Sequence, residues 1–302
     1  MKQPVTAKKS IFFLLTTIVL ILAGYFLSKT FLNSSEKEKK YLMEKITSKD
    51  GTIISFIKSG SGPHLLLVHG TTAEHSRWMP IIPHFEKHFT VYAMDRRGRG
   101  GSGDSPDYHI IREAEDIAAV VEAIGEPVFI LGHSYGGICS LESLLLTDKV
   151  SRLILYEPPV PSGKPFYPPG VSEKMQPLID NSKFESALEI FFRDVVKMPD
   201  YEFEKYSQLP AYEKRIQLVP TIPREMTIEL TYTFQPEKFA DLQVPTLLLL
   251  GGDSPSVFQE ATKLVDSALP DSRIVIMPGQ QHIAMDTNTE LFVKEVKKFL
   301  ME

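Results

Sequence analysis

The sequence predicts an α/β fold, in which a mostly parallel sheet is covered by helices on both faces. Two observations carry this prediction. Short, continuous apolar runs recur along the chain, and segments with helical periodicity separate them. Apolar runs of about four to eight residues are typical of strands that are buried on both faces, as in parallel sheets. Strands that alternate with helices indicate crossover connections between parallel neighbours.

Seven segments fit strands of such a sheet. Most are apolar over their whole length, and the first is rich in β-formers and ends in a Gly/Ser/Pro turn. They are residues 51–57, 65–68, 91–94, 128–131, 153–156, 246–250 and 274–277.

Helical periodicity appears between these strands. Apolar side chains recur at helical spacing from Ile110 to Ile124, and Gly125 follows where a C-terminal cap belongs. A second stripe runs through 138–145. The last helix is expected to begin with the capping box Thr287-x-x-Glu290.

Residues 160–242 break this alternation. The stretch is rich in proline where it begins, and it then becomes helical with many aromatic side chains, among them Phe184, Phe191, Phe192, Tyr201, Phe203, Tyr206 and Tyr212. We therefore expect one α/β domain over 43–302 with a helical cap inserted at about 160–242.

Composition and charge limit the classes of function. The chain has 302 residues, which suits one large α/β domain, and its formal net charge is −5. Its basic clusters are small, whereas nucleic-acid binding needs many phosphate contacts, so no nucleic-acid partner is expected. Cys139 is the single cysteine, which excludes an internal disulfide and any cysteine-based metal site.

The N-terminal segment predicts a membrane anchor. No charged residue occurs from Ser10 to Ser28, and residues 11–27 are long enough to span a bilayer. We expect an uncleaved single-pass anchor over 1–28 and a polar tether over 29–42, with a cleaved signal peptide as the alternative. The catalytic domain is expected outside the cytoplasm, although lysines on both flanks leave the orientation undecided by the positive-inside rule.

A nucleophile is predicted at Ser134. It lies in Gly132-His-Ser-Tyr-Gly-Gly137, between the apolar run 128–131 and a helical stripe. This is G-x-S-x-G in a strand–turn–helix context, where a strained turn exposes the serine and side chains at the glycine positions would collide with their neighbours.

A serine hydroxyl needs a base to accept its proton, and that base needs an acid to orient it. His282 follows the last predicted strand and is the expected base. Asp253 follows the run 246–250 and is the favoured acid, because the order Ser, Asp, His then results. Glu157, at the end of the strand 153–156, is the alternative acid.

The remaining site residues are expected in the loop after 65–68. The backbone N–H groups of Thr71 and Tyr135 are predicted to form the oxyanion hole. Thr72 and Trp78 are candidates for the substrate pocket, and packing beneath the cap is the alternative for Trp78. The motif H-E-x-x-H is absent, and no metal is expected. The Gly/Arg-rich segment 95–104 is expected to be a structural loop with Arg–carboxylate pairs rather than a phosphate site.

In combination, these motifs resemble the α/β-hydrolase fold family. They are His-Gly-Thr-Thr at 69–72, the segment 95–104, the elbow at 132–137, Leu-Gly-Gly-Asp-Ser-Pro at 250–255 and His282. The likeness covers about residues 45–300 and is strongest to bacterial capped members of the esterase and non-haem haloperoxidase branch. It implies an eight-stranded core, a helical cap and no cofactor.

The predicted function is that of a serine hydrolase. Ser134 would attack an ester-like carbonyl of a small, apolar substrate, and water activated by His282 would release the acyl group. Perhydrolysis or acyl transfer at the same site is one alternative. A slow-turnover, ligand-binding signalling protein is another. The sequence makes no prediction of oligomeric state.

Overall fold

The computed structural model describes residues 41–163 and 166–302. The predicted anchor over 1–28, with its membrane span at 11–27, and nearly all of the tether over 29–42 lie outside these residues. Within the described part of the chain, no helix combines the length and apolar character that crossing a bilayer requires. Residues 43–302 form one compact unit.

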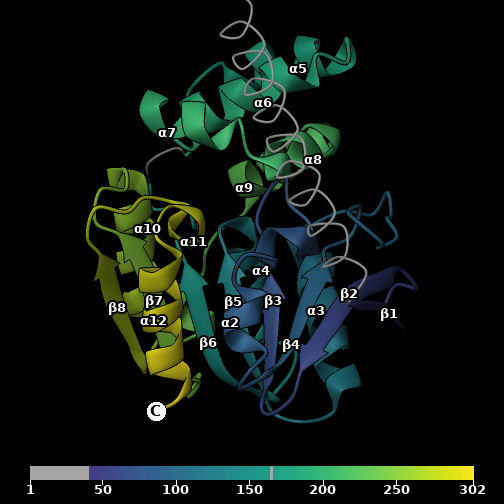
Figure 1. The fold of residues 1–302 in the computed structure, drawn as a ribbon, viewed down its shortest axis with the longest axis vertical. Helices are drawn as coiled ribbons and strands as arrows, with labels where there is room; N and C mark the ends of the chain where they lie inside the picture. Colours follow the sequence, from purple (N-terminus) through teal and green to yellow (C-terminus); the bar gives the residue numbers. More distant parts are fainter. Residues whose placement is uncertain (1–40, 164–165) are drawn as a thin grey trace, which may run out of the picture. The chain divides into compact units, whose positions relative to one another are not determined.

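Eight strands form one sheet in the order β1-β2-β4-β3-β5-β6-β7-β8 (Figure 1). β2 pairs antiparallel with β4, and the pairs that join β4, β3, β5, β6, β7 and β8 are all parallel. The mostly parallel sheet predicted from the sequence is therefore confirmed, and β1 is an addition that no apolar run had indicated. The strands are β1 (Leu42–Thr47), β2 (Ile53–Gly60), β3 (His64–Val68), β4 (Thr90–Asp95), β5 (Val128–His133), β6 (Val150–Tyr156), β7 (Thr246–Gly251) and β8 (Ser272–Met277).

The parallel strands bring distant loops to one edge of the sheet. β4 and β7 are buried along their whole length, which explains their unbroken apolar character. The carboxyl ends of β3, β5, β6, β7 and β8 lie at the same edge, where ligands of open α/β sheets bind. The site must therefore be sought in the segments that follow these strands.

Helices of the α/β domain connect the strands. They are η1 (His75–Trp78), α2 (Ile82–Phe85), α3 (Ile110–Ile124), α4 (Tyr135–Ser143), α10 (Ser256–Ala268), α11 (Ala284–Thr287) and α12 (Thr289–Leu300). Gly125 ends α3 in the left-handed region at φ 79°, as its position predicted. The capping box at Thr287 is wrong, because α12 begins at Thr289 and the Asn288 side chain accepts the N–H of Leu291.

A group of helices separates β6 from β7, in the stretch where a cap was predicted. They are α5 (Val171–Asp180), α6 (Phe184–Ile190), the π-helix η2 (Phe191–Val195), α7 (Asp200–Tyr206), α8 (Pro210–Leu218), η3 (Val219–Thr221), α9 (Ile222–Thr231) and η4 (Pro236–Lys238). Figure 1 shows α5 to α9 beyond the carboxyl ends of the strands. We call α5 to η4 the cap. Its centre is an aromatic cluster of Phe192, Phe203, Tyr206 and Tyr212.

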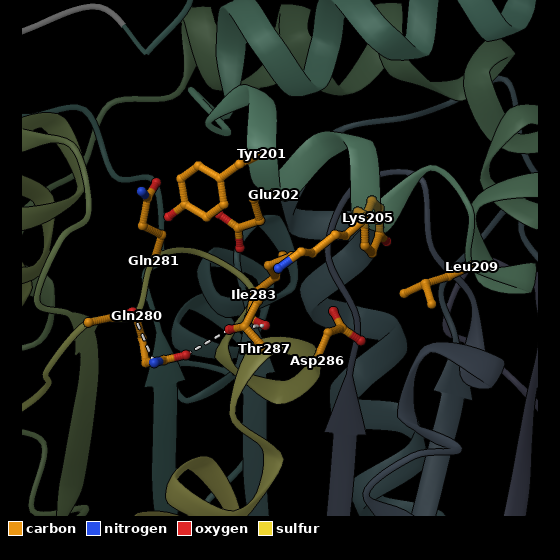
Figure 2. A pocket seen from close by; sticks show the side chains of 11 residues that line it. Tyr201, Glu202, Lys205, Leu209, Gln280, Gln281, Ile283, Asp286 and Thr287 are labelled. Carbon is orange, nitrogen blue, oxygen red and sulfur yellow. Dashed lines mark hydrogen bonds between the residues drawn. The ribbon is translucent and has the colours of Figure 1, made fainter.

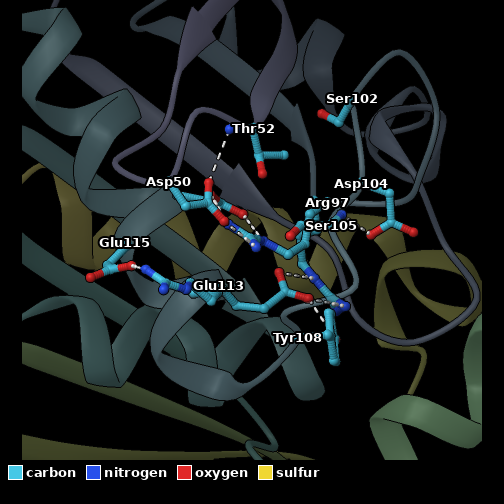
Figure 3. A network of polar contacts seen from close by, with 12 residues as sticks. Asp50, Thr52, Arg97, Ser102, Asp104, Ser105, Tyr108, Glu113 and Glu115 are labelled. Carbon is cyan, nitrogen blue, oxygen red and sulfur yellow. Dashed lines mark hydrogen bonds and ion pairs between the residues drawn. The ribbon is translucent and has the colours of Figure 1, made fainter.

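The loop 95–104 is a network of ion pairs, as predicted. The Arg97 guanidinium contacts Asp116 at 2.7 Å. It also contacts Asp50, at 2.9 Å (Figure 3). Arg96 pairs with Glu113 of α3 and with Glu225 of α9, and Arg99 also binds Glu225, at 2.6 Å. These buried pairs connect the cap to the loop that follows β4.

Candidate active site

Ser134 lies in a sharp turn between β5 and α4. Its backbone has φ 55° and ψ −129°, a region that non-glycine residues adopt only when the surroundings enforce it. Its N–H donates to the Tyr156 carbonyl oxygen at 2.9 Å. A Cβ atom at Gly136 would lie 2.3 Å from the His69 carbonyl oxygen, and one at Gly132 would lie 2.6 Å from Ser140 Oγ. Both glycines of the predicted motif are therefore required for this turn to pack.

His282 is held beside this turn by a carboxylate. Its Nδ1 lies 2.6 Å from Glu157 Oε2, and its side chain is almost fully buried. The ring stacks on Phe258 with 4.4 Å between ring centres. His133 Nε2 donates to the His282 carbonyl oxygen at 2.9 Å. The hydroxyl of Tyr156 bonds to the Gln281 carbonyl and accepts the N–H of Ala284. The loop that carries His282 is thus fixed on both sides.

Glu157 is completely buried at the end of β6, and both of its oxygens are engaged. Oε2 contacts His282, while Oε1 accepts the N–H of Gly251 at 2.8 Å and the hydroxyl of Ser254. A carboxylate fixed in this way can hold a neighbouring imidazole in one tautomer, with the proton on Nδ1.

The predicted contact between Asp253 and His282 is wrong. Asp253 is exposed, its amide donates to the Gln280 carbonyl oxygen at 3.0 Å, and its side chain has no hydrogen bond or ion pair with the described residues. β6 and β7 are parallel neighbours, so the acids that follow them reach the same edge of the sheet. The loop after β7 contributes the groups that hold Glu157 rather than the acid itself.

Ser134 and His282 line one cavity beneath the cap. The cap contributes Phe191, Phe192, Val196 and Arg215 to its wall, and the loop after β3 contributes Gly70 and Thr71. The cavity has a volume of about 30 Å³, and one water needs about 10–15 Å³. In this conformation it has space for roughly two waters, so a substrate requires the cap side chains to move.

The predicted oxyanion donors lie beside this cavity. Thr71 lines it, and Tyr135 is the first residue of α4, directly after Ser134. Within the described residues, neither backbone N–H donates a hydrogen bond to another group. Two unused donors next to a nucleophile, one of them at a helix N-terminus, suit a developing negative charge.

His69 braces the loop that carries Thr71. Its Nδ1 donates to the Gly70 carbonyl oxygen at 2.9 Å, and its Nε2 accepts the Arg96 N–H at 3.1 Å. Burial, followed by the nearby Arg96 and Arg99 charges, lowers the pKa of His69 well below 6.5, so its imidazole is neutral. A neutral ring with both nitrogens engaged has a structural role.

The two candidates for the substrate pocket lie elsewhere. Trp78 is fully buried and packs edge-on against His133, with 6.4 Å between ring centres, and it is not in the wall around Ser134. For Trp78 the structure thus shows packing in the interior rather than a place in this wall. Thr72 is buried at φ 54° in the loop that carries Thr71, where its Oγ1 accepts from Arg215 at 2.9 Å, and it is not in the wall around Ser134.

A larger cavity of about 380 Å³ adjoins the first, because Ile283 lines both. In Figure 2, Tyr201, Glu202 and Lys205 approach it from α7 of the cap. Gln280 approaches it from the loop before His282, and Asp286 and Thr287 approach it from α11. Burial, together with the Asp286 charge, raises the pKa of Glu202. Its wall combines charged and amide side chains with Tyr201, Tyr206, Leu209 and Ile283.

One group of side chains in the described part of the chain has the composition of a metal site. It consists of Glu74, His75 and Asp95. The oxygens of Asp95 accept the His75 N–H at 2.7 Å, the His75 ring at 2.8 Å and the Gly101 N–H at 2.9 Å. These hydrogen bonds give the cluster a structural role, because they join η1 to the loop after β4.

Sequence reasoning missed two parts of this site. Tyr156 and His133 clamp the His282 loop, and their positions at strand ends were the only signal. Arg215 reaches the cavity from α8 of the cap, and no local pattern indicated it. Glu157 was weighed only as an alternative, although its place at a strand end was visible.

Comparisons with known proteins identify the family of the chain. Residues 65–295 match the alpha/beta hydrolase family. The chain is 25% identical to 2-(acetamidomethylene)succinate hydrolase of Mesorhizobium japonicum, over 80% of this chain and 90% of that protein. It is 26% identical to a bifunctional esterase/perhydrolase of Acinetobacter calcoaceticus, over 85% and 99% respectively. A solved structure of an alpha/beta hydrolase from Sphaerobacter thermophilus is similar, with 31% identity, a TM-score of 0.72, and 83% of this chain and 99% of that chain covered. The chain therefore belongs to the alpha/beta hydrolase family, and it is a hydrolase.

Proposed function

We propose that this protein is a serine hydrolase that cleaves an ester-like bond through an acyl-enzyme. One observation carries the proposal. Ser134, in a strained turn, shares a small cavity with His282, whose Nδ1 is held at 2.6 Å by the buried Glu157. This is the nucleophile–base–acid arrangement that activates a serine hydroxyl.

The proposed reaction has two steps. Glu157 keeps the proton of His282 on Nδ1, so Nε2 accepts the Ser134 proton as Oγ attacks the carbonyl carbon. The N–H groups of Thr71 and Tyr135 stabilise the tetrahedral oxyanion. His282 then protonates the leaving group, and the acyl-enzyme remains. A water molecule, deprotonated by His282, releases the acid and restores Ser134.

The walls of the cavity support a small acyl group. Phe191, Phe192 and Val196 give it an apolar side, in accord with the expected apolar substrate. The π-helix η2 places both phenylalanines there, and such helices are frequent at functional sites. Among the described cap residues, Arg215 is the one with a charged side chain in this wall.

The same acyl-enzyme would react with acceptors other than water. The relative from Acinetobacter calcoaceticus carries the name esterase/perhydrolase, which keeps perhydrolysis as a second candidate. Product analysis with hydrogen peroxide and short alcohols at graded concentrations separates the two. A peracid or a new ester as the main product at low acceptor concentration favours transfer, and free acid favours hydrolysis.

Labelling with a fluorophosphonate probe tests the proposal. The wild type and the control Ser143→Ala should be labelled, because Ser143 is a buried serine of α4 whose hydroxyl bonds to Ser140. Ser134→Ala should take no label. A folded wild type without label would contradict the proposal. The same experiment on membrane and soluble fractions tests the predicted anchor over 11–27.

A further inference from the structure

Arg215 of α8 is a buried cation in the wall around Ser134. Only 6% of its surface is exposed, and it lines the cavity together with Ser134 and His282. One guanidinium nitrogen donates to the Thr72 hydroxyl at 2.9 Å and to the Thr71 carbonyl oxygen at 3.3 Å. The cap thus places a positive charge next to the loop after β3, which carries Thr71 and is called the oxyanion loop below.

The other four buried arginines each form an ion pair with a carboxylate. The pairs are Arg77 with Asp286, Arg96 with Glu113 and Glu225, Arg97 with Asp50 and Asp116, and Arg99 with Glu225. Among the residues that the structure describes, Arg215 has no carboxylate within ion-pair distance. Its guanidinium lies instead beside the rings of Phe192 and Tyr206, 5.5 Å from each ring centre.

A second polar group beside Arg215 is also unsatisfied. Tyr206 is 2% exposed, and its hydroxyl lies close enough to interact with the Arg215 guanidinium. A guanidinium can only donate, so the proton of this hydroxyl has no acceptor in the described part of the chain. A buried donor without a partner costs free energy, as does a buried charge without a counter-ion. Burial accordingly lowers the pKa of Arg215, although the Tyr206 side chain and the Asp286 charge oppose that shift.

A carboxylate would satisfy both groups. Guanidinium donors match the two oxygens of a carboxylate, and a phenolic hydroxyl can donate to the same oxygens. The nearby Asp286 does not fill this role, because it is engaged with Arg77 at 2.6 Å. Arg215 lines the cavity around Ser134, and Tyr206 lines the larger cavity that adjoins it. The missing anion is therefore best supplied by a molecule that enters these cavities.

We propose that Arg215, with the hydroxyl of Tyr206, binds a carboxylate of the substrate, and that the enzyme prefers half-esters of short dicarboxylic acids. This inference rests on the proposed hydrolase function. Because Arg215 bonds to Thr71, next to the oxyanion position, the carboxylate is separated from the scissile carbonyl by only a few bonds. The intervening methylene groups would lie against Phe191 and Phe192.

A purely structural role for Arg215 is the competing explanation. Its bonds to Thr71 and Thr72 connect the cap to the oxyanion loop, and losing them would impair turnover of every substrate equally. If Arg215 instead recognises a carboxylate, its loss would change the ratio of kcat/KM between charged and neutral substrates. That ratio is the quantity to measure.

The experiment compares substrates of matched size. Monomethyl succinate and monomethyl glutarate carry the carboxylate, and methyl pentanoate and methyl hexanoate replace it with an ethyl group. Initial rates of acid release give kcat/KM for each ester. The enzymes are the wild type, Arg215→Met, Arg215→Lys, Tyr206→Phe and the control Arg193→Met. Arg193 is a cap arginine that pairs with Glu189 and Asp200 and is not in the wall around Ser134.

The wild type should prefer the charged ester by about tenfold or more, as expected for a charge-assisted pair. Arg215→Met should abolish the preference mainly through KM, and Arg215→Lys should keep part of it. Tyr206→Phe should reduce the preference by about threefold without a loss of stability, since it removes an unsatisfied buried hydroxyl. Arg193→Met should leave the ratio unchanged.

Two results would overturn the inference. One is a wild type that hydrolyses the charged and neutral esters equally well. The other is an Arg215→Met enzyme that loses activity on both by the same factor, which would assign Arg215 to the structure of the oxyanion loop. Failure of the proposed function has a separate signature, namely a wild type that neither takes the fluorophosphonate label nor hydrolyses any of the four esters.

Discussion

The acid that holds His282 is a glutamate at the end of β6, although the aspartate after β7 was the expected choice. Ser134 and His282 were predictable, because a strained strand–helix turn requires glycines and a base must follow the last strand. The acid was not predictable, because Glu157 and Asp253 both follow strands that are parallel neighbours in the sheet. Only the packing of the loop after β7, which directs Gly251 N–H and Ser254 Oγ at Glu157, decides between them.

Substitution of the two acids tests this assignment. Glu157→Gln should lower kcat by about 10²–10⁴, because the amide no longer favours the productive tautomer of His282 or stabilises the imidazolium. Asp253→Asn should stay within about twofold of the wild type, because the Asp253 side chain is exposed and makes no contact with His282. Steady-state kinetics on one ester, with circular dichroism as a check of folding, gives the answer. A larger loss in Asp253→Asn would refute the assignment.

At the scale of elements, apolar runs predicted every strand that is buried on both faces. β1 was not predicted, because it is almost entirely exposed and has no apolar run. The start of α12 also differed from the prediction. Thr287 and Asn288 are both residue types that cap helices, and in the structure Asn288 is the cap. The π-helix η2 had no local signal, because its extra residue per turn is set by packing in the cap.

The contact of α9 with the α/β domain depends on Glu225. This fully buried carboxylate lies between Arg96 and Arg99, and burial beside the Arg96 charge lowers the pKa of Arg99 to about 10. Glu225→Gln should lower the free energy of unfolding by about 3–5 kcal/mol, because both cations lose a buried partner. Urea unfolding measures this change.

The control for Glu225 is an exposed pair between the same two parts. Arg224 of α9 binds Asp104 at 2.7 Å, with both side chains partly in solvent. Asp104→Asn should cost no more than about 1 kcal/mol. Equal losses in the two variants would show that the buried network has no special importance for the cap.

For the whole molecule, the sheet, the insertion between β6 and β7 and the edge that carries the site all follow from sequence periodicity. The side chains of the cap that reach this edge do not, because they depend on how eight short helices pack together. Arg215 illustrates the difference: its helix was expected only as part of a cap, and its position beside Ser134 emerges from tertiary packing alone.

Stability of the whole molecule should depend on buried, neutral histidines. Burial, followed by the His282 and Arg77 charges, lowers the pKa of His133 well below 6.5. Below about pH 6.5 the unfolded chain binds a proton at this position and the native state does not, so stability is lost as the pH falls. The expected contribution is about 1.4 kcal/mol per pH unit for one histidine.

Comparison with His133→Gln isolates this contribution, because glutamine keeps a donor for the His282 carbonyl and does not titrate. Urea unfolding between pH 7 and 5 should show a shallower pH dependence in the variant, by about 1.4 kcal/mol per unit. Parallel curves for the two proteins would mean that His133 is protonated in the native state.

Detection of the acyl-enzyme is the most direct test of Ser134 as the nucleophile. Intact-protein mass spectrometry after rapid quenching with an ester substrate, followed by peptide mapping, locates any covalent adduct. We expect an acyl group on Ser134 that forms and decays during turnover in the wild type. Ser134→Ala should show no such adduct. Turnover without an adduct under conditions where deacylation is slow, or an adduct on another residue, would contradict the proposed mechanism.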